Sequence, residues 1–355
     1  APGFSGNDNW ALDQINLFFA GGFGSHFGAF VQATYDGVAK AWSWDNLDVR
    51  AVKAAKIGAT DVTFGASLNN SPTVQDAWNT LPAWGYPYTS SALAPSPSAS
   101  PLLDGALAQT SLGLTGYAWI NSELYLEGGA YWSPGSRQLT DLGVDPTSPG
   151  AIRGAAPYGR VAFQHDVGPG TLEVGAFGMR SEIYPGLVFN TGYTDRYTDL
   201  GLDGSYIDTL GDSSVITLNG RYIHEDQSLK ATCALAGVAS GCAGNTLDDL
   251  HIDGSYYWRD KIGFTIAGFD TTGGANPTIY AGNRTLAPDS SGVTLQIDGT
   301  PFGAGNSPFG KRFNTRVGIQ YTAYATFNGA GRNYDGLGDN ASDNNTLRVF
   351  AWVAY

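Results

Sequence analysis

Charged residues, cysteines and long apolar runs are all scarce in this sequence. Only 14% of the 355 residues are Asp, Glu, Lys or Arg, whereas a soluble protein carries about 25%. No run of about 18 apolar residues occurs, which excludes a membrane-spanning helix. What is abundant is glycine, with 49 residues, and aromatic residues, at 13%. This composition fits neither a disordered chain nor a helical bundle.

Cys233 and Cys242 are the only cysteines, and they lie in one Ala/Gly-rich segment. We expect them to form a disulfide that closes a small loop if the protein is exported, with two free thiols as the alternative. Covalent haem attachment needs the pattern Cys-x-x-Cys-His, which does not occur. The net charge of −13 argues against nucleic acid as a partner and mildly favours cations over anions.

Signatures of catalysis and of metal binding are also missing. The chain has neither a Gly-x-Ser-x-Gly elbow nor the ligand spacing of a zinc site. Its four histidines, His26, His165, His224 and His251, form no cluster in the sequence. Three aspartates lie among Asn and Gly in residues 333–344, but their spacing is not that of an EF-hand, so we expect a solvated loop. We therefore expect no enzyme and no metal site.

The strongest pattern is the alternation of apolar and polar residues along segments of about ten residues. In residues 314–327 the apolar residues occupy one face and the polar residues the other. The apolar face holds Val317, Ile319, Tyr321, Ala323, Ala325 and Phe327, and the polar face holds Arg316, Gln320, Thr322 and Thr326. Because successive side chains of a strand point to opposite sides, this segment predicts a strand with one apolar side.

About fifteen such segments cover the chain, which is the pattern of a transmembrane β-barrel. A soluble β-sandwich would have shorter strands and a more charged outer face. The last strand, Leu347–Tyr355, alternates to a terminal aromatic residue, as outer-membrane barrels do. We predict an all-β fold, one antiparallel barrel over residues 1–355 in a bacterial outer membrane. The outer face of such a barrel would contact the lipid bilayer and lipopolysaccharide.

Short and long connections alternate between the predicted strands, which fixes the direction of each strand. Both the first and the last strand then run toward the periplasm, so the number of visible strands is odd. Single-chain bacterial barrels have an even number. One ascending strand upstream of residue 1, giving about sixteen strands, explains this, and so does a chain that begins inside or above the barrel. As the sequence lacks a signal peptide, we expect it to be mature or truncated.

The alternation places charged residues of both signs on the water-filled side. They either form rings of charge that set selectivity or pair with one another and hold the wall together. The predicted lumen-lining residues are Arg50, Arg160, Arg221, Arg259, Arg316, Arg348, Asp48, Asp61, Glu123, Glu127, Asp203, Asp253 and Asp298, and Glu173 and Asp199 lie on the same side.

One long connection, residues 70–106, is rich in proline and aromatic residues. Trp78, Trp84, Tyr86 and Tyr88 form its aromatic patch. A loop of this length without its own secondary structure is usually functional or disordered, and this one is too aromatic for disorder. We predict that it folds into the lumen as a constriction or over it as a cap, with a self-packed extracellular loop as the alternative.

Several stretches resemble a known family. They are Ser25–Gly37, Asn79–Ser91, Ser100–Gly105 and Asn333–Leu347. They are similar to proteobacterial outer-membrane porins fused to an N-terminal monohaem c-type cytochrome, a group that includes iron oxidases. The resemblance implies a barrel that sheathes a haem, supplied by an upstream segment or by a cytochrome partner. The missing Cys-x-x-Cys-His segment is a departure from the family, so no haem residue is carried over.

Three functions agree with this sequence. The first is a porin for small hydrophilic solutes, and the second is the barrel of an electron-transfer conduit, which the resemblance favours. The third is a docking barrel for surface cytochromes. The sequence gives neither the pore size nor the oligomeric state.

Overall fold

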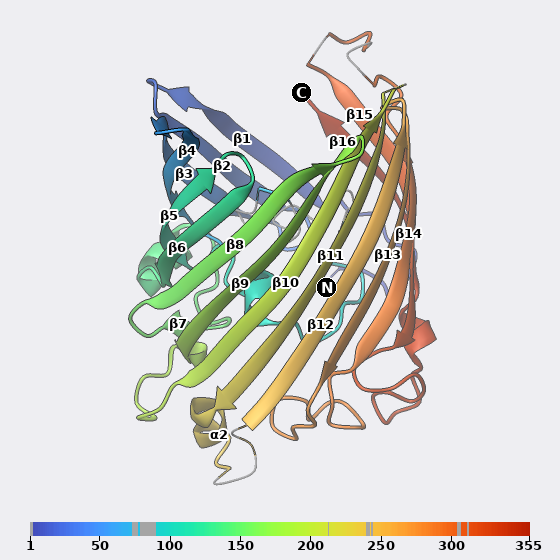
Figure 1. The fold of residues 1–355 in the computed structure, drawn as a ribbon. Helices are drawn as coiled ribbons and strands as arrows, with labels where there is room; N and C mark the ends of the chain where they lie inside the picture. The colour runs from blue at the N-terminus through green and yellow to red at the C-terminus, as the bar shows by residue number, and fades with distance from the viewer. Residues whose placement is uncertain are drawn as a thin grey trace.

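An antiparallel sheet curls into a barrel and makes up most of the molecule (Figure 1). The computed structural model describes residues 3–72, 77–78, 90–211, 213–238, 242, 244–303, 307–310 and 312–355. Among these residues no helix is long and apolar enough to cross a membrane. The prediction of an all-β antiparallel barrel is therefore confirmed.

Fifteen strands follow one another around the wall, each paired antiparallel with the next one in the described chain. They are β1 (Gln14–Phe23), β2 (Phe27–Asp36), β3 (Ala41–Ile57), β4 (Thr60–Asn69), β5 (Leu112–Ile120), β6 (Leu124–Trp132), β8 (Ala156–Val167), β9 (Gly170–Tyr184), β10 (Asp195–Leu210), β11 (Ser214–Leu229), β12 (Gly244–Trp258), β13 (Ile262–Gly273), β14 (Ser290–Gly299), β15 (Asn314–Thr326) and β16 (Thr346–Ala354). The two-residue strand β7 (Ala151–Ile152) lies off this path and pairs with β9.

Short helical turns lie in the connections. They are η1 (Leu102–Ala106), α1 (Ser136–Asp141), η2 (Pro185–Leu187), α2 (Lys230–Leu235) and η3 (Ala341–Asn344). All of them lie in links at one end of the barrel, which we call the long-loop end and which is at the bottom of Figure 1. The opposite end is the short-turn end.

Tight turns at the short-turn end follow from residues that tolerate left-handed backbone. Between β5 and β6, Asn121 and Ser122 have φ of 50° and 59°. Positive φ at two successive positions is the geometry of the hairpin turn that matches strand twist, and Asn favours it. The link between β14 and β15, residues 300–313, is longer than the other links at this end.

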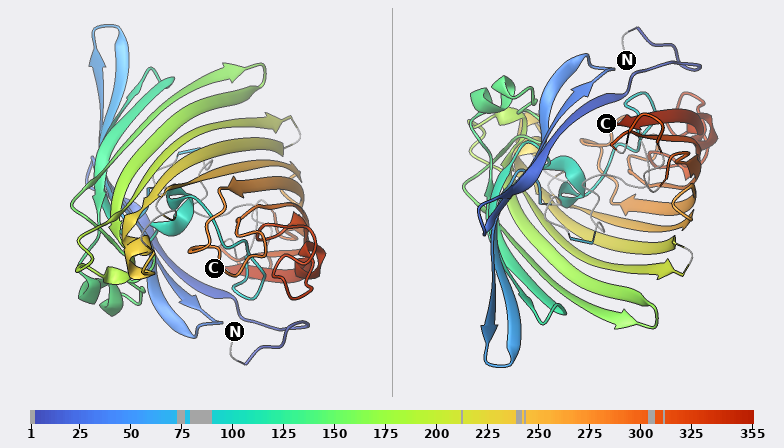
Figure 2. Two further views of the ribbon diagram at one scale, coloured as in Figure 1. Left: turned by 90° about the horizontal axis from the view of Figure 1, so that it is seen from below. Right: turned by 90° about the horizontal axis from the view of Figure 1, so that it is seen from above.

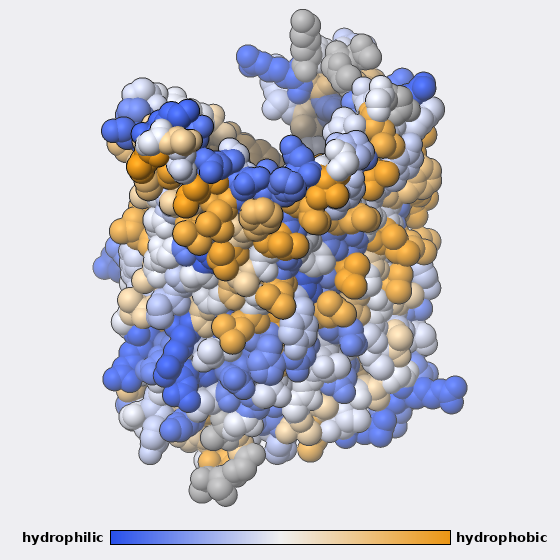
Figure 3. Space-filling model, viewed as in Figure 1, coloured by the Kyte–Doolittle hydropathy of each residue, from blue (hydrophilic) through white to orange (hydrophobic). Residues whose placement is uncertain are grey.

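The outer face of the wall carries exposed apolar side chains on every strand. One from each strand in turn is Leu17, Phe27, Trp42, Phe64, Leu114, Leu126, Val161, Val174, Leu200, Leu218, Ile252, Ile266, Leu295, Ile319 and Val349. In the space-filling view, apolar residues gather across the upper and middle part of the wall, and polar residues predominate toward the long-loop end (Figure 3). A soluble protein rarely exposes so large an apolar surface, whereas lipid requires one.

Glycines on the inner face make room for large rings on the neighbouring strand. Gly201 of β10 is the cross-strand partner of Phe177 in β9, and a Cβ at Gly201 would lie 2.1 Å from the Phe177 ring. Gly113 of β5 faces Tyr131 of β6 in the same way, also at 2.1 Å. The rings thus lie flat over backbone that has no side chain, which packs the wall closely on this side.

Candidate functional site inside the barrel

The chain between β4 and β5 enters the barrel and reaches the opposite wall (Figure 2). The backbone N–H groups of Leu102 and Leu103 donate to the carboxylates of Glu225 and Asp199, at 2.6 and 2.8 Å. Asp199 and Glu225 are cross-strand partners on β10 and β11, so the two acceptors stand side by side. We call residues 101–111 the inward segment.

An ion pair fixes the same turn. The Asp104 carboxylate accepts a hydrogen bond from Arg221 of β11, with an Nη2–Oδ2 distance of 2.7 Å. Asp249 of β12 also lies 3.8 Å from this guanidinium group. Because Arg221 and Asp104 are both largely buried, loss of either partner would leave an ionic group with little access to water.

Apolar packing completes the attachment of the inward segment. Leu102, Leu103 and Leu107 join a buried cluster with residues of the wall and of β7, which are Tyr131, Ile152, Ala156, Tyr158, Phe177, Met179, Ile183 and Ile223. The inner face of β6–β11 is therefore covered by chain, and we call it the filled side. Burying a leucine side chain contributes about 1.5–3 kcal/mol, so the three leucines hold the segment firmly.

On the short-turn side of the inward segment, Trp78 lies against Arg160 of β8. The Arg160 guanidinium group is 5.2 Å from the centre of the Trp78 ring, and the indole N–H donates to Gln164 at 2.7 Å. Of the predicted aromatic patch, Trp78 thus lies inside the barrel, narrowing it. Trp84, Tyr86 and Tyr88 lie outside the described residues.

Arg160 is also the centre of a buried ionic cluster. It donates two hydrogen bonds to Asp203 of β10, at 3.0 and 2.6 Å, and one to Glu173 of β9 at 3.1 Å. All three side chains are at most 1% exposed. One guanidinium group therefore compensates two carboxylates that water hardly reaches.

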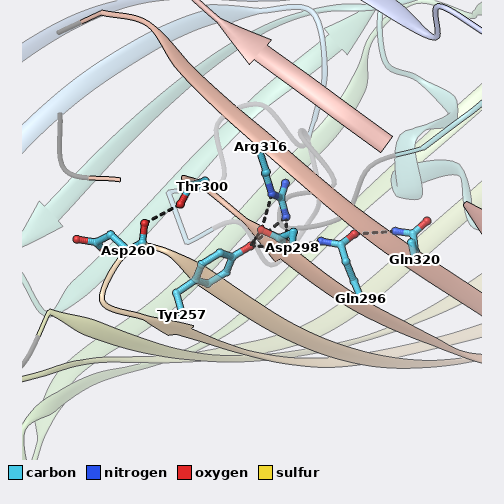
Figure 4. A network of polar contacts seen from close by, with 7 residues as sticks. All are labelled: Tyr257, Asp260, Gln296, Asp298, Thr300, Arg316 and Gln320. Atoms are coloured by element: carbon cyan, nitrogen blue, oxygen red, sulfur yellow. Dashed lines mark hydrogen bonds and ion pairs between the residues drawn. The ribbon is translucent and has the colours of Figure 1, made fainter. Parts of the chain in front are cut away.

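Across the barrel, β12–β16 carry a polar network on the inner face, which we call the polar side (Figure 4). Arg316 of β15 donates from Nε and Nη2 to the two oxygens of Asp298, both at 2.8 Å, and from Nη2 to the Tyr257 hydroxyl at 2.9 Å. Gln296 donates to Asp298 at 2.9 Å, and Gln320 donates to Gln296 at 3.0 Å. Gln296 and Tyr257, which are neutral donors, thus stabilise the Asp298 carboxylate together with Arg316.

The other predicted lumen residues on the inner face also have polar partners. Arg50 pairs with Asp48 at 2.7 Å, and Arg348 pairs with Asp13 at 2.7 Å. Glu127 accepts a hydrogen bond from the Tyr125 hydroxyl at 2.9 Å. Asp253 accepts one from Asn219 at 3.0 Å. Ion pairs therefore account for the five inner-face arginines, Arg50, Arg160, Arg221, Arg316 and Arg348, whereas Glu127 and Asp253 have neutral partners.

Three of the predicted lumen residues lie at the short-turn end instead. Arg259 follows the end of β12 in a turn with φ of 50° and stacks on Trp258, with its guanidinium group 5.4 Å from the ring centre. Glu123 lies in the β5–β6 turn and pairs with His165. Asp61 is the second residue of β4, where it keeps the alternation of the inner face with a side chain that is 72% exposed. Alternation counted past a strand end misplaced Arg259 and Glu123, because a turn does not keep the period of two.

Glu225, Asp104 and Asp249 belong to the site, although the sequence did not single them out. Glu225 and Asp249 continue the alternation of inward residues on β11 and β12, so a longer count would have found them. Asp104 gives no such signal, because it lies in an irregular turn. Asp104, Asp249 and His251 offer ligand atoms within 4.8 Å of one another, but Arg221 already supplies a positive charge to both aspartates.

The predicted disulfide is confirmed, because Cys233 and Cys242 are joined, with their Cα atoms 5.8 Å apart. The bond ties α2 to the chain that leads into β12 at the long-loop end. Both thiols are consumed by this bond, so the cysteines of this chain do not fit covalent haem attachment.

No family model matches the chain, and no curated protein matches it. Among solved structures, it is similar to OmpT (in-vitro folded), an outer membrane protein of Vibrio cholerae, with 10% identity, a TM-score of 0.44, and coverage of 96% of this chain and 89% of that one. The trimer form of OmpT gives 12% identity with the same TM-score and coverage.

Proposed function

We propose that this protein is an outer-membrane β-barrel of a bacterium that forms a narrow, polar-lined pore for small hydrophilic solutes and prefers cations. The observation that carries this proposal is the division of the wall into two faces. Exposed apolar side chains cover the outside on every wall strand, and charged and amide side chains line the inside. That division is the pattern of strands with lipid on one side and water on the other.

The preference for cations rests on the charge of the inner face. Its carboxylates outnumber its guanidinium groups, and Asp253, which is half-buried and hydrogen-bonded to neutral Asn219, adds to the carboxylates that pair with arginine. The chain as a whole carries a formal charge of −13. A pore lined by surplus negative charge concentrates cations and repels anions.

Reconstitution into planar lipid bilayers tests this function. We expect discrete current steps and, across a KCl gradient, a reversal potential of the sign that marks cation selectivity. Asp253→Asn removes a half-buried inner-face charge and should shift the reversal potential toward zero. Asp270→Asn makes the same charge change at an exposed position on the outer face of β13 and should leave it unchanged. Absence of current steps in folded protein would exclude the pore.

The resemblance to cytochrome-fused porins gives a second candidate, the sheath of an electron-transfer conduit. The similar stretches include Ser100–Gly105, which overlaps the inward segment that occupies the lumen. A covalently attached haem would need cysteines outside residues 1–355, since Cys233 and Cys242 are bonded to each other. The visible spectrum of protein taken from its native membrane separates the two: a c-type haem spectrum with little conductance supports the conduit.

A further inference from the structure

Two arginines on the outer face of the wall differ from those inside the barrel. They are Arg180 of β9 and Arg196 of β10, and both are exposed. The inner-face arginines each form an ion pair, whereas neither Arg180 nor Arg196 has an ion-pair partner among the described residues. Their guanidinium groups are therefore available to a molecule outside the barrel.

The period of the strands places both arginines on the lipid-facing side. On β10, Arg196 has the same parity as Leu200 and Leu202, which are exposed on the outer face, and Asp199 and Asp203 with the opposite parity are buried. On β9, the outward row that holds the exposed Leu172 and Val174 leads to Arg180 in the same way.

The two arginines lie just beyond the apolar part of the wall. Leu200 is the last exposed large apolar residue of β10 toward the long-loop end. Arg180 is opposite Thr198, about 7 Å along the strand from Leu200, and Arg196 is about 14 Å from it. Hydrophilic residues predominate over this part of the wall (Figure 3). Because the long loops of such barrels are extracellular, the arginines lie where the head groups of the outer leaflet begin.

The local charge is positive, although the chain as a whole is acidic. Arg153, which follows β7, pairs with Glu182 of β9 at 3.1 Å and is also exposed. Glu182 is the cross-strand partner of Arg196, but it already binds Arg153 and the Thr194 hydroxyl. Three guanidinium groups thus stand beside one carboxylate. Asp226, opposite Thr198 on β11, bounds this positive patch on one side.

The spacing of the arginines suits a phosphate group. Since Arg180 is opposite Thr198 and Arg196 is two residues away, the two Cβ atoms are diagonal neighbours, about 7–8 Å apart. Long side chains at that spacing can reach one anion from two sides, and guanidinium groups bind phosphate oxygens in pairs. The outward residues at the nearby end of β8, Pro157 and Gly159, have no long side chain to cover Arg180.

We propose that Arg153, Arg180 and Arg196 form a binding site for a phosphate group of lipid A, the membrane anchor of lipopolysaccharide. The acyl chains of that lipid would lie against the apolar wall beside Leu200, and its phosphate would lie at the height of the arginines. Any outer-membrane barrel contacts lipid, but this site assigns one lipid phosphate to three residues. The proposal rests on the membrane location and not on the pore.

Native mass spectrometry of the full natural polypeptide in detergent tests the site. On titration with lipid A that carries both phosphates, we expect one molecule to bind before any others. Arg180→Gln/Arg196→Gln should weaken this binding by about tenfold or more, because charge-assisted hydrogen bonds to phosphate are lost. Lys53→Gln/Lys56→Gln is the matched control, since it removes two exposed positive charges near the short-turn end of β3 and should leave the affinity unchanged.

The lipid can be varied as well as the protein. Lipid A without phosphates should bind the unchanged protein as weakly as lipid A binds the arginine variant. Equal binding of the phosphate-free lipid, or an equal loss of affinity in both double variants, would overturn the site. Equal affinity for phosphatidylglycerol, or displacement of lipid A by millimolar inorganic phosphate, would overturn its assignment to lipid A. The conductance measurement can fail while this one succeeds.

Discussion

The filled side and the polar side of the lumen each bury an arginine, but they stabilise it differently. On the filled side, Arg160 meets two carboxylates and two aromatic rings, Trp78 and Phe177. On the polar side, Arg316 meets the Asp298 carboxylate within a network of hydroxyl and amide groups, and it also lies over the Phe350 ring. The difference indicates that the filled side anchors the inward segment, while the polar side presents hydrogen-bonding groups to the inside of the barrel.

Replacement of each of the two arginines should give the largest difference in unfolding free energy between the filled side and the polar side. Arg160→Met leaves Glu173 and Asp203 buried without their shared cation, which should cost about 3–5 kcal/mol of unfolding free energy. Arg316→Met leaves Asp298 with hydrogen bonds from Gln296 and Tyr257, so we expect about 1–3 kcal/mol. Urea unfolding in detergent micelles measures both. An equal or larger loss for Arg316→Met would contradict the comparison.

Substitutions that overpack the inner face should give the second largest difference in stability between the two sides. Gly201→Val pushes a side chain into the Phe177 ring, which is held in the buried cluster, and should cost about 2–3 kcal/mol. Gly263→Val meets Tyr257 on the polar side, at 2.4 Å, but this ring is only half-buried and can turn away, so about 1 kcal/mol is expected. Gly268→Ala, which has no atom within 4 Å of its Cβ, is the control.

The attachment of the inward segment can be weakened without a change in the wall. Asp104→Asn removes the ion pair with Arg221 and should reduce the docking free energy of the segment by about 1–3 kcal/mol. In bilayers we expect a larger and noisier single-channel conductance, since the segment would leave the lumen part of the time. Asp270→Asn serves again as the charge-matched control. Unchanged conductance with Asp104→Asn would mean that the segment does not limit the current.

The smallest effect lies outside both sides, in the loop before β16. The backbone N–H of Leu337 donates to the Asp335 carboxylate at 2.9 Å, and those of Gly338 and Asp339 also donate, which lowers the pKa of Asp335. A lowered folded-state pKa means that this stabilisation is present above the unfolded value of about 3.9 and is lost as the pH falls through the folded pKa. The protection factor of the Leu337 amide against hydrogen exchange should therefore fall in acid. Asp335→Asn should make this protection factor independent of pH, and a pH dependence that persists in the variant would contradict the prediction.

The sequence predicts the wall well, because alternation follows directly from strand geometry. Ile319 and Arg316 fall on the expected sides of β15, and the odd number of strands follows from counting turns. Strand ends are less predictable. Arg259 and Glu123 obey the period in sequence, yet they lie in turns where backbone geometry no longer alternates.

The interior is harder to predict, because it depends on a contact between distant parts of the chain. The aromatic composition of residues 70–106 suggested folding inward, but nothing in the sequence pairs Leu102 with Glu225 or Asp104 with Arg221. Those contacts join an irregular turn to strands more than a hundred residues away. Local patterns carry no information about them.

The ion pair between Asp13 and Arg348 bears on how the barrel assembles. Its partners are 335 residues apart, so it cannot form before the last strand is in place. Because the entropic cost of closing a loop grows slowly with its length, this long separation adds little to the free energy of folding. It does mean that the ion pair forms late in assembly. The pair is formed only when assembly is complete, and a chain that ends before residue 348 has no arginine there to form it.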